Sequence, residues 1–104
     1  MNQARLEELL EEATVDCYGE EEVFWGIVTT LQDNLNFPLR AQAMGEPVEV
    51  IQLDEERSST QRGIVARVRK DGKEYSTSLS ELTFMQLDPD SAEWLAMYRY
   101  WQGE

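Results

Sequence analysis

The sequence predicts an α+β domain in which two helices precede a small, bent antiparallel sheet of four or five strands, and a third helix follows the sheet. Three observations predict this: helical periodicity in residues 2–13 and 19–36, apolar and polar alternation with tight turns in residues 39–86, and a capping pattern at residues 90–101. An SH3-like barrel is the leading form of such a sheet. With 104 residues and 41% hydrophobic content, the chain fits a single domain, 1–104.

Apolar stripes predict the two N-terminal helices. In residues 2–13 the stripe has helical spacing, and glutamates fill the opposite face; its members are Leu6, Leu9, Leu10 and Ala13. In residues 19–36 the stripe consists of Phe24, Ile27, Val28, Leu31 and Leu35. The pair Phe37-Pro38 should end this helix near residues 34–36, because a residue before proline is driven towards extended backbone.

Turn signals divide residues 39–86 into strands. The adjacent apolar residues Val50 and Ile51 break the alternation, which indicates a bulge or burial on both faces. Asp71-Gly72 predicts a hairpin turn. Residues 54–61 are polar and lack apolar anchors, which predicts a mobile loop. Asp90 followed by Glu93 resembles a capping box, which predicts the helix of residues 90–101.

The charge of the chain restricts its ligands. It contains 21 acidic and 9 basic residues and no histidine, for a net charge of -12. Such a surface repels nucleic-acid phosphates and anionic lipids and attracts cations or basic protein surfaces. We therefore expect a divalent cation as the first candidate ligand, and no binding to nucleic acid or membrane.

Other classes of function are disfavoured by what the sequence lacks. Without histidine, the lone Cys17 cannot build the usual zinc sites, and the commonest general base is missing, so we expect neither zinc, nor an organic cofactor, nor catalysis. A carboxylate-based hydrolase is the least favoured hypothesis. The N-terminal residues have no signal-peptide pattern and no apolar run approaches a membrane span, so we expect a cytoplasmic protein.

The densest cluster of carboxylates lies where the second helix should begin. Asp16, Glu20, Glu21 and Glu22 fall within seven residues. Calcium takes roughly six to eight oxygen ligands and tolerates irregular loops. Because successive helical residues diverge by about 100°, the three glutamates cannot all face one ion. Asp16, Glu20 and Glu22 form a feasible metal-ligand set, with Glu21 left to solvent. Alternatively, acidic residues in a first turn only stabilise the helix through its macrodipole.

Two further acidic clusters are weaker candidates. One is Asp54-Glu55-Glu56, of which Asp54 is the predicted metal ligand, and the other comprises Asp88 and Asp90. Such residues more often belong to solvated loops or helix caps than to ligand sets. The spacing of an EF-hand loop is absent, so spacing alone is weak evidence for calcium.

Three segments resemble a known family. A D-x-Y-x-x-x-E segment runs from Asp16 to Glu22, an L-x-F-P-x-x-A segment follows the second helix, and the chain closes with Tyr98-Arg99-Tyr100-Trp101. In this order, over residues 15–101, they resemble the cyanobacterial calcium-binding protein family. The resemblance implies a small acidic cytoplasmic protein that binds Ca²⁺ without an EF-hand, becomes more compact when loaded and buffers free calcium. It matches Asp16 and Glu22 to acidic family positions and says nothing about residues 2–13.

Two hypotheses follow. The leading one is a non-enzymatic Ca²⁺-binding protein that chelates the ion reversibly with surface carboxylates. The alternative is an acidic protein-interaction module that offers its helical glutamates or an aromatic groove to a basic protein partner and has no dedicated metal site.

Overall fold

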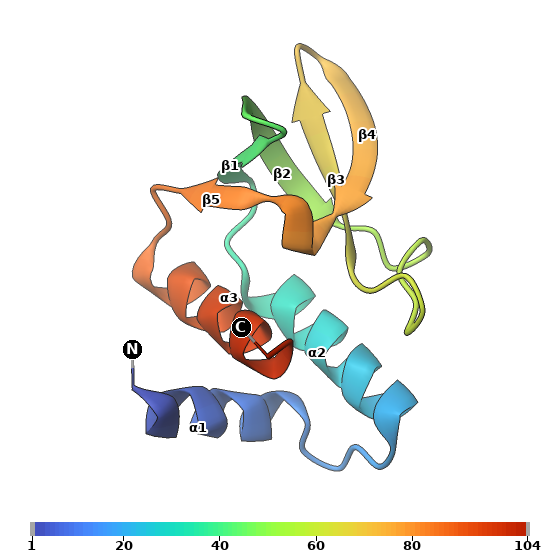
Figure 1. Cartoon of the computed structure of the whole chain (residues 1–104), viewed down its shortest axis with the longest axis vertical. Helices are drawn as coiled ribbons and strands as arrows, with labels where there is room; N and C mark the ends of the chain where they lie inside the picture. The colour runs from blue at the N-terminus through green and yellow to red at the C-terminus, as the bar shows by residue number, and fades with distance from the viewer. Residues whose placement is uncertain (1, 104) are drawn as a thin grey trace. The chain divides into compact units, whose positions relative to one another are not determined.

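The computed structural model describes residues 2–103 and divides the chain into two compact units. The helical unit comprises the residues up to Leu35 and those from Asp88 onward, and the sheet unit comprises Asn36–Leu87. The helical unit contains α1 (Gln3–Ala13), α2 (Glu20–Asn34) and α3 (Pro89–Trp101), and the sheet unit contains a five-stranded sheet; the elements are labelled in Figure 1. The predicted α+β class is confirmed. The single domain over residues 1–104 stays a prediction, and its end residues, Met1 and Glu104, lie outside the described part.

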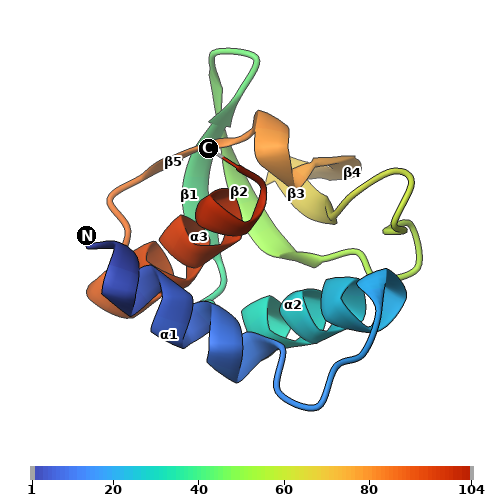
Figure 2. The ribbon, with the colours of Figure 1, turned by 60° about the horizontal axis from the view of Figure 1, so that its bottom comes forward.

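In the helical unit all three helices contact one another (Figure 2). The predicted apolar stripe of α2 is buried, and so is part of the stripe of α1; the buried members are Leu9, Ala13, Phe24, Ile27, Val28, Leu31 and Leu35. From α3, Tyr98 is also buried, and the ring of Trp101 packs against Phe24 and Tyr98. None of the helices between residues 2 and 103 is long and apolar enough to cross a membrane.

Side-chain caps define two of the helix starts. The Asn2 side chain accepts a hydrogen bond from the Arg5 amide at the start of α1, 2.9 Å. At α3 the cap is Asp88, which accepts from the Ser91 amide at 3.0 Å, and not the predicted Asp90. The reason is Pro89: its fixed φ and missing N–H suit the first helical position, so the helix begins one residue earlier than expected.

Polar contacts attach α1 to α3. Arg5 lies 3.0 Å from a carboxylate oxygen of Glu93 and 2.8 Å from one of Glu8. The Tyr100 hydroxyl donates to Glu7 at 3.1 Å, and this bond to a carboxylate raises the pKa of Tyr100 above its usual value. Because these groups are partly exposed, each contact contributes little to stability by itself.

The backbones of α1 and α2 approach closely at Gly26. A Cβ atom placed on Gly26 would lie 2.7 Å from the Ala13 carbonyl oxygen and 2.8 Å from the sulfur of Cys17. Cys17 is therefore part of the packing between the two helices. Only glycine allows this separation, since contacts this short are not found for real Cβ atoms.

The sheet unit contains β1 (Leu39–Ala43), β2 (Glu46–Leu53), β3 (Val65–Lys70), β4 (Lys73–Ser78) and β5 (Thr83–Met85), with a short 3₁₀ helix, Leu79–Glu81, before β5. The strands are antiparallel in the order β4-β3-β2-β1-β5. The predicted antiparallel sheet is confirmed. Its edge strands, β4 and β5, do not pair with each other within the described residues, so the sheet is open and not a closed barrel.

Two local predictions for the sheet are confirmed. The register of β2 against β3 shifts between Val50 and Gln52, which leaves Ile51 as the extra residue of a bulge. Asp71 and Gly72 join β3 to β4 with φ values of 52° and 79°. Positive φ at both central positions is characteristic of a type I′ turn, which matches the twist of the flanking strands.

Replacing Gly26 with alanine should destabilise the fold. The substitution raises intrinsic helix propensity by up to about 1 kcal/mol. It also inserts a methyl group against a backbone carbonyl that cannot rotate away, and overpacking typically costs about 1–3 kcal/mol. We expect urea unfolding to show a lower free energy of unfolding for Gly26→Ala.

The matched control is Thr29→Ala on the exposed side of α2, which gains helix propensity without meeting a neighbour. It should leave stability unchanged or slightly raised. Equal stability of Gly26→Ala and Thr29→Ala would contradict the close approach.

Candidate metal site

The negative charge is concentrated in the helical unit. That unit contains thirteen acidic and two basic residues, whereas the sheet unit contains eight acidic and seven basic residues. The net charges are therefore -11 and -1. Between Arg5 and Arg40 there are nine acidic residues and no lysine or arginine. The segment of α1, the following loop and α2 is thus the strongest attractor of cations in the chain.

The loop between α1 and α2 has a defined backbone. After α1 ends, the Thr14 carbonyl accepts a hydrogen bond from the Cys17 amide at 3.0 Å. Asp16 has a left-handed φ of 60°, which aspartate tolerates better than most residues. Gly19 caps α2 with a φ of 88°, and its surroundings would leave room for a Cβ, so glycine is required there by backbone conformation alone.

The predicted ligands of the α1–α2 junction are all exposed. Asp16 lies in the loop, and Glu20 and Glu22 occupy the first turn of α2. Glu21, which the sequence left to solvent, is exposed but accepts a hydrogen bond from the Trp25 indole at 3.4 Å. This contact orients the Glu21 carboxylate along α2.

The junction is not a preassembled cage. Within residues 2–103, no three aspartate, glutamate or cysteine side chains lie close enough together to hold a metal ion. The ligand set Asp16, Glu20 and Glu22 therefore stays a prediction. The unpaired backbone amides in the first turn of α2 form the positive end of the helix dipole, and this positive charge opposes the binding of a cation.

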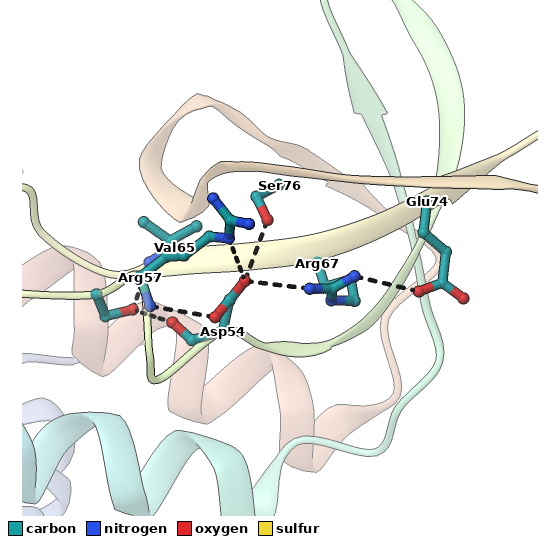
Figure 3. A network of polar contacts seen from close by, with 7 residues as sticks. Asp54, Arg57, Val65, Arg67, Glu74 and Ser76 are labelled. Atoms are coloured by element: carbon teal, nitrogen blue, oxygen red, sulfur yellow. Dashed lines mark hydrogen bonds and ion pairs between the residues drawn. The ribbon is translucent and has the colours of Figure 1, made fainter.

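Asp54, the fourth predicted ligand, lies in the sheet unit and is buried, with 7% of its surface exposed. Figure 3 shows its carboxylate among three side chains. One oxygen lies 3.3 Å from Arg57, 3.6 Å from Arg67 and 3.1 Å from the Ser76 hydroxyl, and the other accepts from the Arg57 amide at 3.2 Å. Two guanidinium groups thus already compensate this carboxylate, which makes it a poorer cation ligand than an exposed one. Its metal role stays a prediction.

Polar anchors attach the loop after β2 to the sheet unit. The buried Ser58 hydroxyl donates to the Asp54 carbonyl at 2.7 Å and accepts from the Val65 amide at 2.8 Å, and the Asp54 amide donates to the Val65 carbonyl at 2.7 Å. The pattern of apolar residues in the sequence did not predict these anchors, because Asp54 and Ser58 are both polar. The available signal was the Asp-x-x-x-Ser spacing, since both side chains bond readily to nearby backbone.

Comparison with known proteins gives two structural matches. The crystal structure of Anabaena CcbP has a TM-score of 0.83 at 23% identity and covers 100% of this chain and 93% of its own. A calcium-binding protein in its calcium-binding form has a TM-score of 0.78 at 22% identity and covers 98% and 91%. At these identities the likeness concerns the fold alone. No curated protein sequence matches significantly.

A family model shows to which family the chain belongs. The calcium-binding family model of CcbP matches residues 7–102, nearly the whole chain. This range contains the three predicted ligands of the α1–α2 junction and the sheet. The chain belongs to the CcbP calcium-binding family.

Proposed function

We propose that the protein binds Ca²⁺ reversibly with exposed carboxylates of its helical unit and thereby buffers free calcium, without catalysing a reaction. The observation that carries this proposal is the segregation of charge: the residues between Arg5 and Arg40 bring nine carboxylates and no internal cation. Membership of a calcium-binding family supports it. The calcium-binding form of one structural relative is consistent with it.

The chemistry of the donor set favours calcium over other metals. Without histidine, and with one half-buried cysteine, the chain offers mainly oxygen ligands. Hard cations prefer these, and Ca²⁺ tolerates irregular geometry with water completing its shell, whereas Mg²⁺ requires a near-octahedral arrangement. An exposed, open junction therefore suits Ca²⁺ better than Mg²⁺.

The proposed ligands are Asp16, Glu20 and Glu22. The left-handed backbone of Asp16 and the capping position of Gly19 bring the loop to the first turn of α2, where both glutamates lie. Because the carboxylates must reorient and must overcome the helix dipole, we expect modest affinity, which suits a buffer that releases its ion.

Binding should stabilise the protein. The helical unit has a net charge of -11, and each bound Ca²⁺ neutralises two of these negative charges and so reduces their mutual repulsion. A ligand that binds only the folded state adds RT ln(1 + [L]/Kd) to the free energy of unfolding, which is about 2.7 kcal/mol when the free ligand concentration is one hundred times Kd.

The remaining expectations belong to the same proposal. A net charge of -12 disfavours nucleic acid and anionic membranes as partners. Action in the cytoplasm and the absence of catalysis remain predictions from the sequence, which lacks histidine.

The first test measures thermal unfolding of chelator-treated protein with and without millimolar Ca²⁺ at fixed ionic strength. We expect Ca²⁺ to raise the melting temperature more than Mg²⁺ does, because both dications screen the charge equally and only Ca²⁺ has the size and flexible coordination that suit the open junction. The triple variant Asp16→Asn, Glu20→Gln, Glu22→Gln should lose this difference. Calorimetric titration of the same proteins gives stoichiometry and affinity.

The control removes carboxylates from the sheet unit with Glu55→Gln and Glu56→Gln, both exposed in the loop after β2. It should keep the Ca²⁺ response. An identical response to Ca²⁺ and Mg²⁺ in the unmodified protein would refute a calcium site and leave screening alone.

Asp54→Asn separates a structural role of Asp54 from a metal role. The variant leaves Arg57 and Arg67 without their buried carboxylate, so we expect the free energy of unfolding to fall by about 1–3 kcal/mol. Calcium stoichiometry should be unchanged, because the exposed junction remains. Chemical unfolding and calorimetric titration measure the two quantities, with Glu56→Gln as the exposed control. Loss of one bound Ca²⁺ would instead assign Asp54 as a ligand.

A further inference from the structure

The helical unit contains a groove that the calcium proposal does not use. It has a volume of about 660 Å³ and is lined by residues of α1, the following loop, α2 and α3: Glu8, Glu11, Glu12, Val15, Thr30, Asn34 and Trp94. All of these residues belong to the helical unit. The groove therefore exists within one compact part of the structure.

The groove combines negative charge with apolar surface. Glu8, Glu11 and Glu12 are exposed and come from α1. Val15 is 69% exposed, which is unusual for a β-branched aliphatic residue in a chain that buries most of its others. Trp94 is partly exposed and supplies aromatic surface. The lining is thus suited to a ligand that is both cationic and apolar.

Little internal charge compensates the glutamates. Glu8 pairs with Arg5, which also pairs with Glu93, and Arg99 is the only other basic residue of the helical unit. In the part of the chain that the structure describes, neither Glu11 nor Glu12 has an ion pair. These two carboxylates are free to receive cationic groups from another molecule.

We propose that this groove docks a basic amphipathic segment of a partner protein. Its apolar side chains would cover Val15 and Trp94, and its lysines or arginines would face Glu8, Glu11 and Glu12. Charge complementarity selects this occupant. A second copy of the chain has a net charge of -12 and is repelled, and a hydrated metal ion would leave the apolar wall uncovered.

The test uses two fluorescent synthetic peptides and measures binding by fluorescence anisotropy at about 0.15 M salt with a chelator present. One peptide places leucines and lysines on opposite faces of a helix. The other has the same number of lysines but serine in place of each leucine. Because calcium is removed, the result does not depend on the proposed metal site. We expect the leucine-containing peptide to bind at least about tenfold more tightly.

Variants locate the binding surface. Glu11→Gln with Glu12→Gln should weaken the leucine-containing peptide by about fivefold to tenfold, since each exposed ion pair contributes modestly. Val15→Ser should weaken that peptide and leave the serine-containing peptide unchanged. The control, Glu55→Gln with Glu56→Gln, removes the same charge from the sheet unit and should change binding less than about twofold. Circular dichroism confirms that each variant is folded.

Two results would overturn the proposal. Equal affinity for both peptides would show attraction by bulk charge with no use of the apolar wall. Equal weakening by the groove pair and by the control pair would show that the peptide does not occupy this groove. Val15 lies in a loop outside the helices, so Val15→Ser still tests the proposal if the double variant in α1 is unstable.

Discussion

The close approach of α1 and α2 at Gly26 positions both acidic features of the protein. The Ala13 carbonyl and the Cys17 sulfur occupy the space where any other residue would carry its Cβ. The loop between the helices must therefore turn within a few residues, which it does through Asp16 and Gly19 at positive φ. The same loop carries a predicted calcium ligand and the exposed wall of the groove. The close approach at Gly26 thus supports both candidate binding surfaces.

The two units differ in how far basic side chains compensate their carboxylates. In the sheet unit, several acidic side chains have basic partners: Asp54 faces two arginines, Glu49 faces Arg69, and Glu46 faces Lys70 (Figure 3 shows the first of these). In the helical unit most carboxylates face solvent, and two arginines cannot compensate thirteen acids. This arrangement costs stability through repulsion, which external cations relieve. Attraction of cations to the helical unit is therefore a physical consequence of where the basic residues are placed.

Much of the fold follows from local patterns in the sequence. The helices have clear apolar stripes, Asp71-Gly72 specifies its turn, and the adjacent pair Val50 and Ile51 marks the bulge. The anchoring of the loop by Asp54 and Ser58 was not predictable from apolar periodicity, because the partners Val65, Arg67 and Ser76 are distant in sequence. The candidate calcium site between α1 and α2 was likewise only partly predictable. Composition and order of residues locate the acidic junction, but whether its carboxylates converge depends on side-chain conformations that no pattern specifies.

The proposed groove and the proposed calcium junction belong to the same negatively charged unit and should therefore be electrostatically coupled. Val15 lines the groove and Asp16, the next residue of the same loop, is the first proposed calcium ligand. Both lie in the helical unit, whose net charge of -11 acts on a bound cation and on a basic segment alike. A Ca²⁺ ion at Asp16 therefore reduces the negative potential that attracts a basic segment to Glu11 and Glu12. Linkage is reciprocal, so the docked segment lowers the affinity for calcium by the same factor. A partner bound in the groove would thus weaken calcium binding at the junction, and bound calcium would weaken binding of the partner.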